Sequence, residues 1–156
     1  MIDDKRHLPP YRQSLAGTLL AAREAVMGPI RPMLREVGLT DQQWRVLRVL
    51  VDQGPVDAST LARAALLYAP TVTRILRDLV ARGLVTRFTN PADGRRSIIK
   101  ISRQGRVTVD RTAMQTRVVL DQYAERFGPS RLAALQAELV ALVEAIGEGE
   151  ELLGEE

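Results

Sequence analysis

The sequence predicts a mainly α-helical fold that carries one small β-hairpin. Apolar residues recur at three- and four-residue spacing through most of the 156 residues, which is typical of amphipathic helices. Strand character is confined to two short apolar runs, 84–88 and 97–101, and turn formers such as Asn90 and Gly94 separate them. The hairpin is therefore expected to lie between two groups of helices.

Two helices are expected in the N-terminal third of the chain. The first runs over about 14–37 and should be kinked or interrupted at Gly28-Pro29, because proline lacks the N–H that a helix interior needs. Thr40 or Asp41 begins the second helix, which ends at Gly54.

A helix-turn-helix followed by a wing is predicted in the middle of the chain. Asp57 caps a short helix over about 58–65, and the next helix has Pro70 in its first turn, where a missing N–H costs little. Gly83 ends that helix. This spacing is typical of a helix-turn-helix, and the hairpin that follows it would form the wing of a winged helix.

Two further helices are expected after the hairpin. Ser102 begins a long helix that ends near Phe127, and Gly128-Pro129 separates it from a last helix that starts at Ser130. One face of the long helix consists of Val107, Arg111, Met114 and Val118. The last helix has a narrow apolar stripe, suited to a helix of a second subunit, with packing inside the same subunit as the alternative. The predicted dimer interface consists of Leu132, Leu135, Leu139, Leu142 and Ile146.

Basic side chains concentrate in the predicted winged helix. Residues 58–106 hold ten Lys or Arg and two Asp, a local charge of +8 in a chain whose net charge is +3. A basic helix beside a basic hairpin suits binding to a DNA duplex through its major and minor grooves. The alternative is that these basic residues only form a solvated surface. A winged helix that only mediates protein contacts has no need of this charge. Double-stranded DNA is therefore the expected partner.

Several other classes of function are not expected. The chain has no Cys and one His, which leaves neither thiolate chemistry nor an imidazole cluster for a metal ion. Neither standard Gly-rich phosphate loop is present. An enzyme, a metal site and a cofactor are thus not expected. The lack of a signal peptide and of an apolar run of about 18 residues predicts a cytoplasmic protein with no membrane partner.

The second helix of the helix-turn-helix is expected to read DNA. At about 100° per residue its apolar side chains fall on one face, and polar side chains fall on the other. An arginine on the polar face can donate to guanine in the major groove, while Arg82 and Lys100 are expected to contact phosphates. The apolar face consists of Val72, Ile75, Leu76 and Leu79, and the predicted DNA contacts are Thr71, Thr73, Arg74 and Arg77.

The most specific motifs of the chain are residues 39–50, residues 79–85 and the wing triplet 93–95. They resemble the MarR family of dimeric bacterial transcription regulators, and the resemblance covers about 13–146. It implies that Arg95 enters a minor groove, which favours an inserted arginine where it is narrow. It also implies that Asp93 pairs with Arg95 or a neighbouring arginine, and that Arg96 lies near a phosphate.

Short blocks over 22–27, 31–32 and 42–48 further resemble the MarR regulators of homoprotocatechuate degradation operons. Because MarR proteins bind aromatic acids between the dimer helices and the DNA-binding lobe, this resemblance implies a phenolic carboxylate as effector. Arg23 lies within the apolar stripe of the first helix, where an arginine binds an anion or pairs with an acid such as Glu24. The expected effector-binding residues are Arg23, Trp44 and Arg45, with Arg48 as a further candidate.

The resulting hypothesis is one domain over 1–156, with a winged-helix lobe at about 38–106 flanked by a helical dimerisation region at about 13–37 and 107–146. It would act as a homodimeric repressor of an aromatic-acid catabolic operon, released from a palindromic operator by a phenolic carboxylate. The alternatives are a DNA-binding regulator with no small-molecule effector and a winged-helix module for protein interactions.

Overall fold

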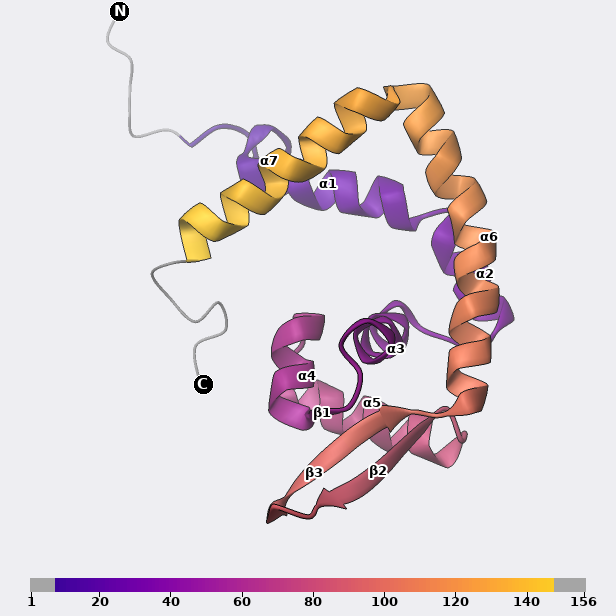
Figure 1. Cartoon of the computed structure of the whole chain (residues 1–156). Helices are drawn as coiled ribbons and strands as arrows, with labels where there is room; N and C mark the ends of the chain where they lie inside the picture. Colours follow the sequence, from indigo (N-terminus) through magenta and orange to yellow (C-terminus); the bar gives the residue numbers. More distant parts are fainter. Residues whose placement is uncertain (1–7, 148–156) are drawn as a thin grey trace, which may run out of the picture.

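The computed structural model describes residues 8–147 and shows a winged-helix lobe below two helical arms (Figure 1). The mainly α-helical fold with a small hairpin is confirmed. None of the helices in the described range is long and apolar enough to cross a membrane. The elements are η1 (Tyr11–Gln13), α1 (Leu15–Met27), α2 (Ile30–Glu36), α3 (Asp41–Gln53), β1 (Val56–Asp57), α4 (Ala58–Ala65), α5 (Ala69–Ala81), β2 (Val85–Asn90), β3 (Asp93–Ile101), α6 (Arg103–Phe127) and α7 (Pro129–Gly147).

Polar N-caps set the starts of four helices. Ser14, Thr40, Asp57 and Ser102 each accept a hydrogen bond from the backbone N–H three residues further on. These starts are the predicted ones. The expected interruption at Gly28-Pro29 is also confirmed, since it divides the first predicted helix into α1 and α2.

The core of the lobe lies between α3, α4, α5 and the sheet. The predicted apolar face of α5 is buried in it, whereas Thr73, Arg74 and Arg77 are exposed. Burial of one leucine or isoleucine side chain contributes roughly 1.5–3 kcal/mol, so this face holds α5 firmly in place. The buried side chains of α5 are Val72, Ile75, Leu76 and Leu79, and their fully buried neighbours include Leu47, Leu50, Leu61 and Ile99.

The sheet has three antiparallel strands in the order β1-β3-β2. The two-residue strand β1, which was not predicted, pairs Val56 with Ile99. The prediction placed residues 93–96 at the hairpin tip, but β3 already begins at Asp93. A register irregularity between Thr89 and Asn90 accommodates this longer strand. The wing is therefore longer than the apolar runs alone indicated.

The face of α6 that packs on the rest of the chain differs from the apolar face expected from the sequence. Val107, Met114 and Val118 are exposed. Polar residues are tolerated on the buried face because the hydroxyls of Thr112 and Thr116 donate to carbonyls of their own helix. The buried positions are Gly105, Val109, Thr112, Thr116 and Val119.

The base of α6 is fixed to the junction between α5 and β2. The Ser102 hydroxyl donates to the Gly83 carbonyl at 2.6 Å, and the Ser102 N–H donates to the Leu84 carbonyl at 3.0 Å. Gly105 lies so close to Leu84 that a Cβ would stand 3.0 Å from the Leu84 carbonyl carbon and closer still to its oxygen. Helix α6 thus begins at the point where α5 is followed by the wing strand β2.

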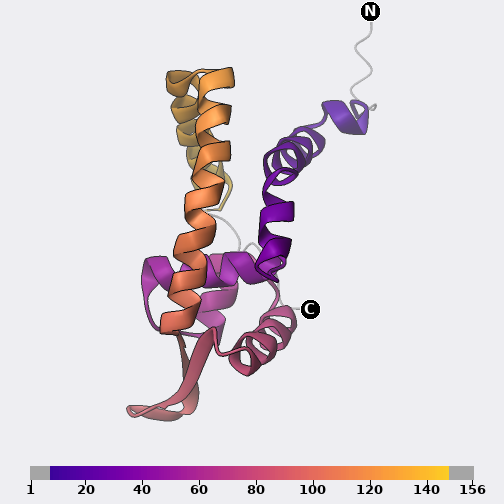
Figure 2. The ribbon, with the colours of Figure 1, turned by 90° about the vertical axis from the view of Figure 1, so that its right-hand side faces the viewer.

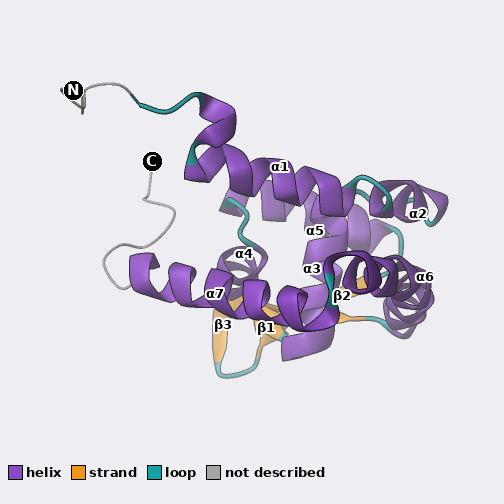
Figure 3. Cartoon of the chain, turned by 90° about the horizontal axis from the view of Figure 1, so that it is seen from above, coloured by secondary structure: helices purple, strands orange, loops and turns teal. Residues whose placement is uncertain are grey.

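Two arms rise from the lobe, one made of α1 and α2 and the other of α6 and α7 (Figure 2). The Tyr123 hydroxyl of α6 donates to the Val26 carbonyl of α1 at 2.9 Å, and this hydrogen bond connects the two arms. Seen from above, α1 and α7 extend to the same side of α6 (Figure 3). Neither helix is embedded in the chain's own core, since Gly17 is the one buried residue of α1 and α7 has none.

Candidate nucleic-acid interface

The outward face of α5 presents two arginines without acidic partners. Arg74 and Arg77 are exposed, and neither makes an ion pair within residues 8–147. The Thr73 hydroxyl donates back to the Ala69 carbonyl at 3.1 Å, which leaves its oxygen able to accept. Thr71 is half-buried at the flank. As predicted, the polar side chains of α5 lie on its exposed face and the apolar ones on its buried face.

The two predicted phosphate-contacting residues differ in their surroundings. Arg82 donates to the Asp78 carboxylate of its own helix at 3.3 Å, so part of its hydrogen-bonding capacity is already used. Lys100 is exposed on β3, directly opposite Thr86 of β2. Of the two, Lys100 retains the more accessible charge.

Asp93 organises the wing as an acceptor. Its Oδ1 accepts the Arg95 N–H at 3.1 Å, and its Oδ2 lies 3.7 Å from the Nε of Arg96. A terminal nitrogen of Arg96 also lies 3.7 Å from the Asp57 carboxylate. The partner of Asp93 is therefore the backbone of Arg95 and the side chain of Arg96. The Arg95 guanidinium has no ion-pair partner in the part of the chain that the structure describes.

A groove of about 480 Å³ lies between the first two turns of α4 and the wing. It brings together Arg63 and Arg87, for which the sequence predicts no role. The N–H of Thr60 donates to the Asp57 carboxylate at 2.7 Å, and this hydrogen bond lowers the pKa of Asp57. The lining residues are Asp57, Ala58, Ser59, Thr60, Arg63, Arg87, Arg95, Arg96 and Ser97.

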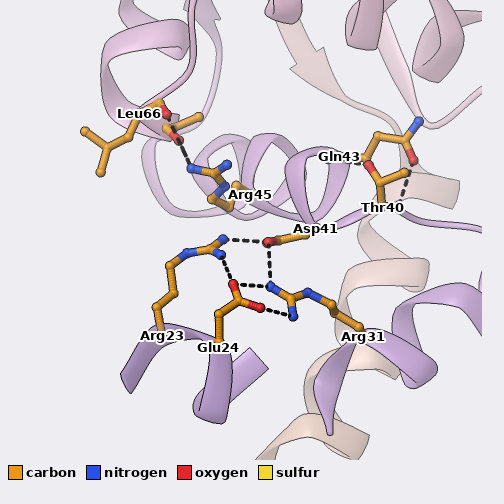
Figure 4. Close-up of polar contacts among 9 residues, drawn as sticks. Arg23, Glu24, Arg31, Thr40, Asp41, Gln43, Arg45 and Leu66 are labelled. Carbon is orange, nitrogen blue, oxygen red and sulfur yellow. Dashed lines mark hydrogen bonds and ion pairs between the residues drawn. The ribbon is translucent and has the colours of Figure 1, made fainter. Parts of the chain in front are cut away.

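Arg23 is held by acids at the contact between the arm and the lobe (Figure 4). Its guanidinium lies 2.5 Å from the Asp41 carboxylate at the start of α3 and 3.3 Å from the Glu24 carboxylate. Arg31 donates twice to Glu24, at 2.7 and 2.8 Å, and this contact lowers the pKa of Glu24. The ion-pair alternative considered for Arg23 is thus present in the structure.

The three predicted effector-binding side chains have different surroundings in the structure. Trp44 belongs to the core, with 8% of its surface exposed. Arg45 donates to the carbonyls of Ala65 and Leu66 at the end of α4 (Figure 4). The guanidinium beside the Trp44 ring is that of Arg48, 5.6 Å from its centroid and exposed. Arg48 also lies 3.9 Å from the Asp52 carboxylate. Because the Arg45 guanidinium is bound to carbonyls, Arg48 is still the candidate retained for an anion contact beside the Trp44 ring.

Comparisons with known proteins agree with this geometry. A family model described as the MarR family matches residues 37–96, from the end of α2 to the wing. The HTH-type transcriptional regulator FarR of Neisseria gonorrhoeae is 34% identical over 82% of this chain and 90% of its own length. The homoprotocatechuate degradative operon repressor of Escherichia coli is 33% identical over 78% of this chain and 82% of its own length.

Among solved structures, that of NadR in complex with 4-hydroxyphenylacetate resembles this chain with a TM-score of 0.77. The two are 32% identical, and the similarity covers 87% of this chain and 96% of the NadR chain. The likeness includes the arms as well as the lobe, because residues 37–96 alone could not reach this coverage.

Proposed function

Because the chain belongs to the MarR family of transcriptional regulators, we propose that it is a homodimeric repressor that binds a palindromic operator. The observation that carries this proposal is the outward face of α5, where Arg74 and Arg77 are exposed and unpaired within the described range. In a helix-turn-helix the second helix lies in the major groove, so these arginines would contact base edges there. The wing, with Arg95, would contact the adjacent minor groove.

We propose that a second copy of the chain packs against the apolar surface of α7. Leu135 is 44% exposed and Ile146 is 58% exposed, Leu132, Leu139 and Leu142 are half-buried, and no residue of α7 is fully buried. The predicted stripe from Leu132 to Ile146 would become the seam of a dimer. Exposed Leu15 and Leu19 of α1 would extend this seam.

The proposed effector is an aromatic carboxylate. The Escherichia coli relative is named for homoprotocatechuate degradation, and NadR was solved with 4-hydroxyphenylacetate. In this chain Arg48 would bind the carboxylate next to the Trp44 ring. Arg23 would act from the facing arm, where it now pairs with Asp41. If the ring hydroxyl of the bound acid displaced Asp41 from Arg23, the contact between the arm and the lobe would change.

DNA binding is tested by fluorescence anisotropy with duplexes from upstream of the protein's own gene. Wild type should bind one palindrome with strong salt dependence. The Arg74→Ala/Arg77→Ala variant should lose about a hundredfold or more in affinity, since each good base contact provides ~1–3 kcal/mol. Arg111→Ala, an exposed arginine on α6, is the control. Absence of salt-sensitive binding by wild type would reject the proposal and favour the protein-interaction module.

The effector is tested by thermal shift and anisotropy with 4-hydroxyphenylacetate and homoprotocatechuate. Release of DNA by a factor of one hundred requires about 2.7 kcal/mol of coupling between the two sites. Stabilisation should be lost in Arg48→Ala, weakened in Arg23→Ala and retained in Arg111→Ala. If no aromatic acid shifts the melting temperature, the chain is a DNA-binding regulator without this effector.

A further inference from the structure

We propose that the groove between α4 and the wing binds a phosphate of the DNA backbone, and that Arg63 and Arg87 are its ligands. This groove, lined by the nine residues given above, is the arginine groove. The proposal rests on the DNA binding proposed above and adds a contact that neither the recognition helix nor the wing tip makes. It assigns a role to two arginines that are far apart in the sequence.

Strand alternation explains why arginines line one wall of the groove. Side chains two residues apart on a strand share a face, and directly paired residues of neighbouring strands share it too. Arg87 pairs directly with Ile99, which is buried on the core face of the sheet. Ser97 and Arg95 continue the same face of β3 toward the wing tip. Beyond the core, this face of the sheet therefore becomes polar and basic.

The opposite wall comes from the first two turns of α4. Ser59 and Arg63 are four residues apart and so lie on the same face of the helix. The neighbouring Leu61 and Ala62 are buried, which fixes the rotation of α4 and leaves Arg63 exposed beside the wing. Two elements that are each anchored by core residues thus hold the arginines in position.

The charges in the arginine groove are not balanced. Four arginines line it, and Asp57 is the one acid among its lining residues. Arg96 lies within 3.7 Å of both Asp57 and Asp93. The other three, Arg63, Arg87 and Arg95, have no ion pair within residues 8–147. Cations that converge in one groove repel each other, and a bound anion would relieve that repulsion.

The lining favours a phosphate over an aromatic acid. Ala58 is the one apolar side chain in the arginine groove, so an aromatic ring would find almost nothing to pack against. Guanidinium groups and the hydroxyls of two serines match the donors that bind phosphate oxygens. The position also fits, because the first helix of a helix-turn-helix crosses the DNA backbone while the second lies in the major groove.

The test measures affinity for the operator and for an unrelated duplex, each over a range of salt concentrations. Phosphate contacts position a protein without reading sequence. Arg63→Ala and Arg87→Ala should each lower both affinities by the same factor, about tenfold, and reduce the salt dependence by roughly one released ion. Arg63→Lys should recover part of the loss, and the control Arg111→Ala should match wild type.

A complementary variant should act in the opposite direction. Asp57→Asn removes the carboxylate from the arginine groove, whereas asparagine still caps the N-terminus of α4. It should therefore strengthen binding to both duplexes, by about threefold or more, while the melting temperature falls slightly because the ionised cap is lost. Weaker binding, or no change, would contradict the proposal.

The arginine groove could also bind a free phosphate anion instead of a DNA phosphate. Thermal shift of the protein with inorganic phosphate and pyrophosphate distinguishes the two ligands. If these anions stabilise wild type through Arg63 while Arg63→Ala and Arg87→Ala keep full DNA affinity, the groove binds a free anion and the proposal is wrong. Equal DNA affinity of wild type and both variants also overturns it. Failure of wild type to bind DNA would instead reject the proposed function itself.

Discussion

Gln43 donates a hydrogen bond from its Nε2 to the Asp78 carboxylate at 2.7 Å and so ties the first turn of α3 to the recognition helix α5. The Oε1 of the same side chain accepts the Thr40 N–H at 3.0 Å and completes the capping box of α3. Asp41, which follows Thr40, pairs with Arg23 of the arm. A continuous set of polar contacts therefore leads from α1 to the helix that would read DNA.

Gln43→Glu should weaken the tie between α3 and α5. Glutamate keeps the acceptor that caps Thr40 but loses the donor and places a second carboxylate beside Asp78. We expect the free energy of unfolding to fall by about 1–2 kcal/mol, because an exposed hydrogen bond is lost and the two carboxylates repel each other. Urea unfolding measures it. Adding Asp78→Asn should recover part of the loss, and a purely additive double variant would show that the two residues are not coupled.

Gly105→Ala should destabilise the junction at the base of α6. A Cβ there would stand 3.0 Å from the Leu84 carbonyl carbon, so the helix must move away from the sheet. Forced overpacking of this kind costs about 1–3 kcal/mol, which differential scanning calorimetry would detect. Gly94→Ala is the matched control because no atom lies within 4 Å of its added Cβ. Equal melting temperatures would show that the contact adjusts freely.

The N-cap at Asp57 should give the protein a specific acid sensitivity. Asp57→Ala removes the acceptor for the Thr60 N–H and should cost about 1 kcal/mol at neutral pH. The folded state lowers the pKa of Asp57, so its stabilisation is complete above the unfolded-state value of about 3.9. It disappears as the pH falls through the lowered folded-state pKa. The difference between wild type and Asp57→Ala should thus shrink in acid, and a difference independent of pH would be inconsistent with an ionised cap.

Arg77 and Arg95 should affect sequence preference differently. Arg77→Ala should relax the preference at particular base pairs of the major groove. Arg95→Ala should weaken binding most at sites with A·T pairs under the wing, where a narrow groove attracts arginine. Selection from a random duplex library, with half-site centres expected about 10 bp apart, measures both. If each variant lost the same factor on every sequence, both arginines would be phosphate ligands.

Charges on the α7 stripe should separate the subunits. Leu135→Asp with Leu142→Asp places two carboxylates in the proposed seam, at a cost of several kcal/mol if it is buried. Light scattering should then show a monomer or an unfolded chain, and operator affinity should collapse because the half-sites are no longer linked. Ala133→Asp with Ala137→Asp, on the opposite face of α7, is the control. A stable dimer with unchanged affinity would remove the stripe from the interface.

Local patterns in the sequence predict most of the lobe. The faces of α5 follow from helical periodicity alone, so Val72 and Leu76 were correctly expected inside and Arg74 outside. The caps at Thr40, Asp57 and Ser102 are equally local, because each contact spans three residues. Features of this kind do not depend on where distant parts of the chain lie.

Features that depend on distant pairing were missed. The strand β1 has two residues and no periodicity, and it exists because Val56 meets Ile99. The arginine groove was missed for the same reason, since Arg63 and Arg87 become neighbours only when α4 packs beside the wing. For Arg45 the sequence showed a cation on α3 but not the carbonyls of Ala65 and Leu66 that bind it.

The attachment of Ser102 to Gly83 and Leu84 couples the base of α6 to the lobe. Its 25 residues, at ~1.5 Å each, span roughly 37 Å. A tilt of about 5° at the Ser102 attachment would therefore displace the far end of α6 by ~3 Å relative to the lobe. In a dimer joined at the far ends, the same tilt would instead move each lobe along the DNA. That displacement is close to the ~3.4 Å rise of one base pair, so in such a dimer a rotation of a few degrees would change the register by about one base pair.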